Sequence, residues 1–253
     1  MANWSDPPTG ASAYVGAGAR GDAVDAGLRS YMLSVYNYMA SGVLLTGIVA
    51  LLFAKTEWVQ SLYSLNSFGE RTGMSPLGWA VALGPLAIVL VMSFGQRRLS
   101  TGTMQLMFWA FAFLMGLSLS TLFLVYTDGS IAQCFFATAA GFAGLSLWGY
   151  TTKRDLSGFG TFLVMGLVGL IVAMVLNVLI FHSTQMEMVI SAVGVLIFAG
   201  LTAYDTQKIK SMYDYVAGTE MQGKAVILGA LTLYLDFINM FLFLLRLFGS
   251  SRN

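Results

Sequence analysis

The feature that most constrains this chain is a series of seven apolar stretches, each roughly 18 to 24 residues long. A helix rises about 1.5 Å per residue, so about 20 apolar residues cross the hydrocarbon core of a bilayer. A transmembrane barrel would instead show shorter stretches of alternating polarity. The stretches cover residues 31–54, 78–95, 104–126, 131–150, 159–181, 188–206 and 225–248. The sequence therefore predicts an all-α integral membrane protein with seven transmembrane helices.

The scarcity of charge agrees with a location in the lipid bilayer. Charged residues make up 10% of the chain, against about 25% in soluble proteins. The net charge of +1 gives no reason to expect a nucleic-acid partner. A single cysteine, Cys134, and a single histidine, His182, exclude an intramolecular disulfide and a multi-histidine metal site. We therefore expect no cofactor, and any chemistry must rest mainly on carboxylate, hydroxyl, amide and backbone groups.

The distribution of basic residues predicts how the chain is oriented. Residues 1–29 are polar, and we expect a flexible cytoplasmic tail ahead of a seven-helix domain over residues 30–253. Nine of the thirteen basic residues lie in this tail and in the loops at 96–103, 151–158 and 207–224. The positive-inside rule therefore places the N-terminus in the cytoplasm and the C-terminus outside. An odd number of spans agrees with this orientation.

One carboxylate stands where lipid should exclude it. Asp236 lies some eleven residues from either end of the last apolar stretch, which places it close to the bilayer midplane. A charge at that depth costs at least about 2.5–3.5 kcal/mol on insertion scales and usually has a function. Asn239 follows three residues later on the same helix face and is a supporting amide.

Asp205, near the cytoplasmic end of the sixth stretch, is the candidate partner of Asp236. Two neighbouring carboxyl groups in a dry site share one proton, and they repel each other once that proton leaves. Such a pair is a pH-sensitive latch, and its oxygens also suit Ca²⁺. The spacing alone leaves their meeting open, because a straight helix puts Asp236 roughly 17 Å below the surface. A structural ion pair between Asp205 and Lys208 is the alternative.

Three segments resemble the Bax inhibitor-1 family, also called TMBIM, in its bacterial inner-membrane branch. They read GLTAYDTQKIK at 200–210, GALTLYLDFINMF at 229–241 followed by LLRLFG at 244–249, and GYTTKRDLS at 149–157. The resemblance extends over about residues 29 to 249. It implies a fold in which the last helix is surrounded by the other six, and a pH-sensitive Ca²⁺ leak across the membrane.

The resemblance also implies roles for individual residues. The family's paired aspartates correspond to Asp205 and Asp236, which implies that these two side chains meet. Its latching arginine, at the end of the second helix, corresponds to Arg97 or Arg98. Taken from the residues alone, both arginines are most simply anchors that fix topology. Some bacterial relatives modulate a membrane-bound protease.

Three functions are compared on these grounds. The first is a pH-gated Ca²⁺ leak channel in the bacterial inner membrane. The second is a non-conducting regulator of another membrane protein, such as a membrane-bound protease, with contacts through the tail and the loop at 211–223. The third, an intramembrane aspartyl protease, is disfavoured because the Gly-x-Gly-Asp motif is missing at Asp236. We therefore expect a channel and no enzyme.

Overall fold

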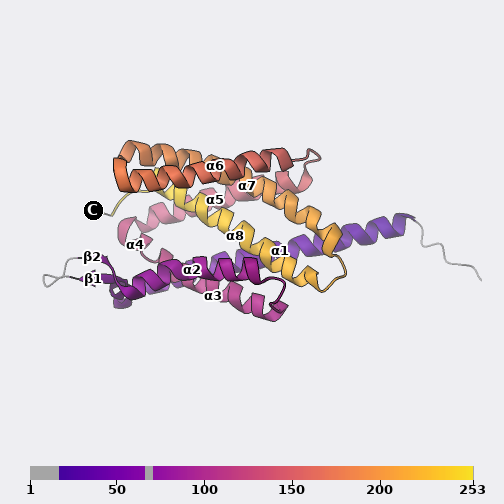
Figure 1. Cartoon of the computed structure of the whole chain (residues 1–253), viewed down its shortest axis with the longest axis horizontal. Coiled ribbons are helices and arrows are strands. Elements are labelled where there is room, and N and C mark those ends of the chain that lie inside the picture. Colours follow the sequence, from indigo (N-terminus) through magenta and orange to yellow (C-terminus); the bar gives the residue numbers. More distant parts are fainter. Residues whose placement is uncertain (1–16, 66–70, 253) are drawn as a thin grey trace, which may run out of the picture.

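The computed structural model describes residues 17–65 and 71–252, and it contains seven helices long and apolar enough to cross a membrane (Figure 1). These are α1 (Ala17–Ala54), α2 (Pro76–Gly95), α3 (Thr101–Leu119) with the short α4 (Leu122–Val125), α5 (Asp128–Thr151), α6 (Ser157–Leu176), α7 (Thr184–Val216) and α8 (Met221–Phe248). A π-helical turn, η2 (Asn177–Phe181), extends α6. The prediction of an all-α membrane protein with seven spans is confirmed.

Hydroxyl side chains begin four of the spanning helices. Ser75, Ser100, Thr127 and Ser183 each have extended backbone, and each side-chain oxygen accepts a hydrogen bond from the amide three residues further on. Such caps satisfy amides that have no partner within the helix. The helix starts are therefore fixed by local sequence as well as by packing.

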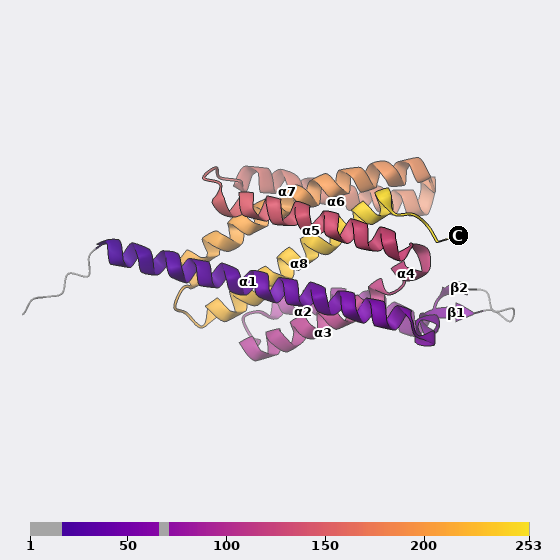
Figure 2. The ribbon, with the colours of Figure 1, turned by 180° about the vertical axis from the view of Figure 1, so that it is seen from behind.

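Helix α8 forms the centre of the bundle. It packs directly against α7, α1, α5 and α3, while α2 packs mainly on α3 and α6 mainly on α7. Figures 1 and 2 show α8 running obliquely between the layer of α6 and α7 and the layer of α2 and α3. The last helix is central, as expected, and α7, α1, α5 and α3 make the most extensive contacts with it.

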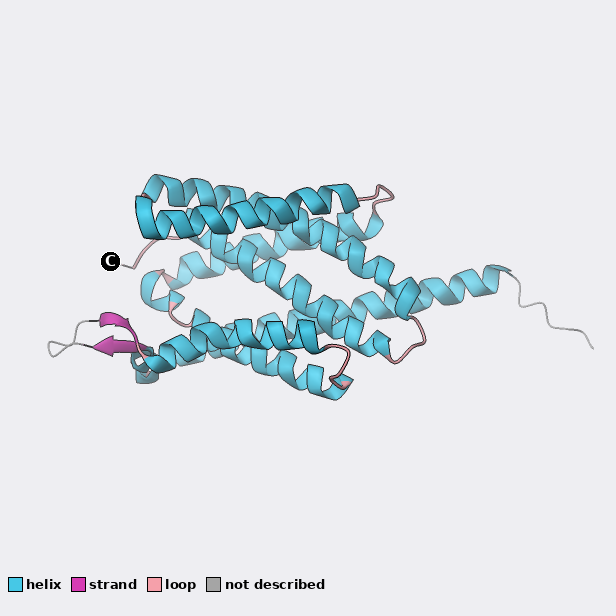
Figure 3. Cartoon of the chain, in the orientation of Figure 1, coloured by secondary structure: helices cyan, strands magenta, loops and turns pink. Residues whose placement is uncertain are grey.

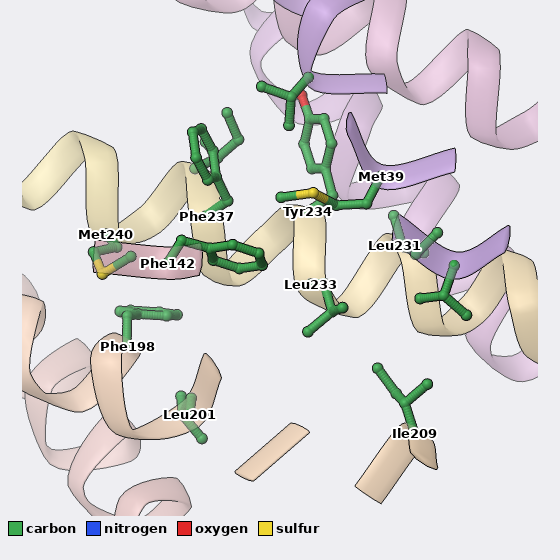
Figure 4. Close-up of a cluster of buried hydrophobic side chains, with 14 of the residues drawn as sticks. Met39, Phe142, Phe198, Leu201, Ile209, Leu231, Leu233, Tyr234, Phe237 and Met240 are labelled. Atoms are coloured by element: carbon green, nitrogen blue, oxygen red, sulfur yellow. The ribbon is translucent and has the colours of Figure 1, made fainter. Parts of the chain in front are cut away.

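The side chains of α8 explain why this helix is central. Leu233 and Tyr234 are fully buried, and Phe237 packs edge to face on Phe142 of α5 with ring centroids 5.6 Å apart. Figure 4 shows these side chains leaving α8 in different directions toward its neighbours. A helix that is apolar on every side belongs in the interior of a bundle. The outer helices, by contrast, expose large apolar side chains, as expected against lipid.

The end of α7 differs from the expectation. The apolar stretch was expected to end at Thr206, but the helix continues without interruption to Val216. The segment expected as a loop at 211–223 is therefore helical in part, and the connection to α8 is only Ala217–Glu220. Hydropathy identifies the part of a helix that faces lipid, and a polar continuation into water escapes that criterion.

Short connections and the ends of the described chain lie at the two ends of the bundle. Between α1 and α2 lie a 3₁₀ helix, η1 (Glu57–Leu62), and the antiparallel strands β1 (Tyr63–Leu65) and β2 (Arg71–Met74), with Tyr63 opposite Met74 (Figure 3). At the same end, Ser251 pairs with Tyr126. At the other end, residues 17–29 of the expected tail belong to α1, and residues 1–16 lie outside the described residues.

Candidate functional site

Asp236 lies in the middle of the central helix. It follows Met221 by fifteen residues and precedes Phe248 by twelve, and its side chain is 4% exposed. Its Oδ2 atom is buried without a hydrogen-bond partner. Burying an unpaired carboxylate costs several kcal/mol or more, so a position of this kind needs a compensating neighbour or a proton.

The extension of α7 brings Asp205 to the level of Asp236. Asp205 precedes the end of α7 at Val216 by eleven residues, and Asp236 follows the start of α8 at Met221 by fifteen. At about 1.5 Å per residue, the two carboxylates lie about 16 Å and about 22 Å from the α7–α8 turn. The remaining offset of about 6 Å is within reach of two side chains on packed antiparallel helices. The sequence-based estimate measured the depth of Asp236 from the membrane surface and took α7 to end at Thr206. It therefore could not decide whether the two side chains meet.

The two carboxyl groups lie close enough for each to act on the charge of the other. Asp205 is half-buried on α7, in the most extensively packed helix pair of the molecule. Lys208 also acts on Asp205 from one turn away, but its ammonium lies over the ring of Tyr204, 5.8 Å from the centroid. Within the described ranges the one ion pair joins Arg252 to Asp128, so the expected alternative of an Asp205–Lys208 ion pair is not formed.

Asn239 does not supply its amide to Asp236 in this arrangement. Its Nδ2 atom donates a 2.8 Å hydrogen bond to the carbonyl oxygen of Leu235, four residues earlier in the same helix. The Asn239 side chain therefore lies one helical turn from Asp236 and bonds to a backbone carbonyl instead of the carboxylate. Its role as a supporting residue remains a prediction.

Arg97 and Arg98 are not brought to the aspartates. Both side chains are exposed in the turn that follows α2. Beside them, Lys224 of α8 donates a hydrogen bond to the carbonyl of Gln96, at 3.2 Å. Lys224 precedes Asp236 by twelve residues, or about 18 Å along the helix. A latch formed by either arginine would require a different arrangement of this end of α2.

A buried hydroxyl pair holds α8 on the side of α1. The hydroxyl oxygens of Thr46 and Tyr234 lie 2.7 Å apart, and Thr46 also donates to the carbonyl oxygen of Ala112, at 2.7 Å. Because the single Thr46 hydrogen goes to Ala112, the Tyr234 hydroxyl is the donor to Thr46. This network ties α1, α3 and α8 together two residues from Asp236, and the sequence analysis did not find it.

A second chain of hydroxyls reaches the neighbourhood of Asp205. Tyr36 of α1 lies 2.8 Å from the Oγ atom of Ser146 in α5, which lies 2.9 Å from Oγ1 of Thr206 in α7. Thr206 directly follows Asp205 and is fully buried. Hydroxyl residues inside apolar stretches, such as Ser146 and Thr206, were the signal that could have revealed this chain. The polar neighbourhood of the carboxylates thus extends across three helices.

The turn between α5 and α6 is fastened to α7. The side chain of Gln207 accepts a hydrogen bond from the Leu156 amide, at 2.9 Å, and donates one to the Arg154 carbonyl, at 2.8 Å. Asp155 in this turn is fully exposed. Hydrogen bonds from the side chain and the backbone amide of Ser157 lower the pKa of Asp155 below its ordinary value. This turn is part of the charged segment at 149–157.

A seven-helix membrane protein with a buried carboxyl on its central helix is thus the class that the fold and the site define. The model of the family described as inhibitor of apoptosis-promoting Bax1 matches residues 28–253. The chain therefore belongs to the Bax inhibitor-1 family.

Several bacterial proteins are similar to this chain over most of their length. An uncharacterised protein of Rickettsia prowazekii is 46% identical, covering 90% of this chain and 93% of its own. The inner membrane protein YbhL of Escherichia coli K12 is 45% identical, covering 90% of this chain and 94% of its own. An uncharacterised protein of Caulobacter vibrioides is 44% identical, with 90% and 92% covered. The similarity therefore extends over the whole bundle.

Proposed function

We propose that this protein is a pH-sensitive leak channel for Ca²⁺, gated by Asp205 and Asp236. The observation that carries the proposal is the buried, unpartnered Oδ2 atom of Asp236 on the central helix, with a second carboxyl group acting on it from α7. Charged side chains deep in a membrane protein are costly and usually mark an ion pathway or a proton relay.

The gating step follows from the electrostatics of the pair. Two neighbouring carboxyl groups away from water share one proton, and the proton supplies the hydrogen bond that each would otherwise lack. Loss of that proton leaves two negative charges at the α7–α8 contact and pushes the helices apart. The same ionised oxygens are hard ligands of the kind that Ca²⁺ prefers. Proton loss therefore changes both the packing of α8 and its affinity for a cation.

The Thr46–Tyr234 hydroxyl contact indicates which helix moves during gating. Thr46 and Tyr234 hold α8 to α1 and α3, while Asp205 belongs to α7, which packs on α8. Repulsion between the carboxylates acts on α7 against a helix that is fixed on its other side. In this proposal Arg97 or Arg98 stabilises the closed state only after the end of α2 has moved inward.

The proposal includes a location and an orientation. We place the protein in the bacterial inner membrane, the location stated in the name of its Escherichia coli relative, inner membrane protein YbhL. The basic loops place the N-terminus in the cytoplasm and the C-terminus outside. The transported ion is the substrate, and we propose no cofactor and no catalytic activity.

The test is Ca²⁺ flux into liposomes that contain the purified protein, measured at two pH values. The proposal requires flux above that of empty liposomes and a dependence on pH that the Asp205→Asn and Asp236→Asn variants change. Unchanged flux and unchanged pH dependence in both variants would contradict it. A protein that is silent in liposomes but co-purifies with a membrane-bound protease would instead support the non-conducting regulator.

A further inference from the structure

A long apolar cavity lies between α1 and α5. Its volume is about 800 Å³, within the range of about 300–1,000 Å³ that is typical of ligand sites. Phe237 of α8 forms part of its floor. In Figure 2, α8 is seen behind and between the ribbons of α1 and α5. The cavity therefore extends from the lipid-facing surface to the central helix.

The cavity is elongated along the bundle. On α1 it is lined from Arg29 to Leu44, and on α5 from Phe135 to Tyr150, so the ends of each range are fifteen residues apart. At about 1.5 Å per residue this is a length of about 22 Å, more than the hydrocarbon depth of one leaflet, about 15 Å. Small side chains at Ala40, Ala139 and Ala143 leave the space between the two helices open. A single extended hydrocarbon chain fits these dimensions.

One end of the cavity carries positive charge. Because spans one and four run in opposite directions, Arg29 of α1 and Tyr150 of α5 lie at the same end. The Nζ atom of Lys210 donates to the carbonyl oxygen of Tyr150, at 2.8 Å, and lies 4.8 Å from the centroid of its ring. Across the described part of the chain, neither Arg29 nor Lys210 has a carboxylate within 4.0 Å. Arg29 lines this end of the cavity itself, and Lys210 adds a positive charge through its contact with the lining residue Tyr150.

We propose that this cavity binds one acyl chain of an anionic phospholipid, whose phosphate lies between Arg29 and Lys210. An apolar channel of acyl-chain length matches the hydrocarbon part of such a lipid, and two cations at one end, with no described carboxylate within 4.0 Å, match its anionic headgroup. The bound chain contacts Phe237, the residue after Asp236, and so supports the buried face of the central helix. The binding site stands apart from any conduction of ions.

The experiment uses the purified full chain in a neutral detergent, titrated with phosphatidylglycerol or with phosphatidylcholine of the same acyl chains. Lipid binding is followed by native mass spectrometry and by the midpoint of thermal unfolding. We expect phosphatidylglycerol to bind more tightly and to raise the midpoint more. Arg29→Gln should weaken phosphatidylglycerol binding about tenfold, the loss of one charge-assisted hydrogen bond, and should weaken the binding of the zwitterionic phosphatidylcholine less. Arg154→Gln, a nearby exposed basic residue outside the cavity lining, should change neither.

A second variant tests the acyl part of the site. Ala143→Phe places a ring in the cavity and should weaken the binding of phosphatidylglycerol at least tenfold. Ala137→Phe is the matched control, because Ala137 is also an exposed alanine on α5 but does not line the cavity. Ala143 is itself exposed, so a folding defect is not expected, and the Arg29→Gln comparison tests the proposal without it.

Three results would overturn the proposal. Equal binding of the two lipids, with no effect of Arg29→Gln, would mean unspecific lipid around the bundle. A shift with glycerol phosphate equal to that with phosphatidylglycerol would assign the basic end to a free phosphate. A dimer that Ala143→Phe dissociates, in lipid-free detergent, would assign the cavity to a second copy of the chain.

Discussion

The hydroxyl oxygens of Thr46 and Tyr234 lie 2.7 Å apart at the buried contact between α1 and the central helix, two residues before Asp236. Tyr234 donates and Thr46 accepts, because the Thr46 hydrogen is already given to the carbonyl of Ala112. A buried polar contact therefore holds the central helix to α1 two residues away from Asp236.

The two members of this hydroxyl pair should differ in how much stability they contribute. Tyr234→Phe leaves Thr46 bonded to Ala112 and should lower the free energy of unfolding by about 1 kcal/mol. Thr46→Val leaves the fully buried Tyr234 hydroxyl without a partner and should cost more, about 1–3 kcal/mol. Thermal unfolding in detergent of both variants and of the double variant measures the coupling. Equal and additive losses would show that the two hydroxyls do not interact.

Gly149 is a site of close approach between α5 and α7, near Asp205. A β-carbon at this position would collide with the backbone carbonyl oxygen of Ala203. Gly149→Ala should therefore separate the two helices and destabilise the bundle by about 1–3 kcal/mol. Gly144→Ala, on the same helix, meets no atom within 4 Å and should leave stability unchanged or slightly higher. Thermal unfolding that ranks the two variants in the opposite order would refute the packing assignment.

Gln207 should control the order of the turn between α5 and α6. Its side chain holds both the Leu156 amide and the Arg154 carbonyl, so Gln207→Ala should release residues 152–156. We expect faster hydrogen exchange in this turn, while the interior of α5 stays protected. Lys208→Ala is the control, since this exposed side chain does not contact the turn through any of these hydrogen bonds. Hydrogen exchange in the turn that rises equally in both variants would contradict the role of the Gln207 hydrogen bonds.

The orientation of the chain can be tested with single cysteines. Cys134 is buried, so Cys134→Ala provides a background without an accessible thiol. Thr219→Cys, in the α7–α8 turn, should react with an impermeant reagent only from the cytoplasmic side, and Ser251→Cys only from the outside. Both positions are exposed. The reverse labelling pattern would invert the topology inferred from the basic loops.

The sequence predicted the seven spans because lipid selects apolar residues along whole helices. It also singled out Asp236 as a charge inside an apolar span, and the structure places this residue in the interior of α8. It did not predict the end of α7. Residues 207–216 carry lysines and an aspartate, which lower the hydropathy of the segment although Ile209 and Tyr213 within it are buried. This error in helix length is what left the meeting of Asp205 and Asp236 open.

Other parts of the site were beyond reach of the sequence for a different reason. The hydroxyl chain from Tyr36 through Ser146 to Thr206 joins residues far apart in the chain, and only the packing of three helices brings them together. The same holds for Thr46 and Tyr234. The latch role of Arg97 or Arg98 came mainly from the resemblance, and both side chains are exposed in the structure.

The most direct test of the proposed gate compares the pH dependence of Ca²⁺ flux in wild-type and Asp236→Asn protein. Asparagine imitates a neutral carboxyl group, so the variant should show, at every pH, the flux that the wild type shows at acidic pH. The matched control is Asp155→Asn, at an exposed carboxylate outside the spans. The hydrogen bonds from Ser157 lower the pKa of Asp155, so they stabilise the folded protein while the carboxylate is ionised. This stabilisation is present above about pH 4 and is lost only as Asp155 is protonated below that.

Asp155 therefore stays ionised between about pH 5 and about pH 8, and its variant should retain the wild-type pH profile. The account predicts a pH-dependent flux in the wild type and in Asp155→Asn, and a flux independent of pH in Asp236→Asn. An Asp236→Asn protein whose flux follows pH as the wild type does would contradict the role of this carboxyl group as the gate.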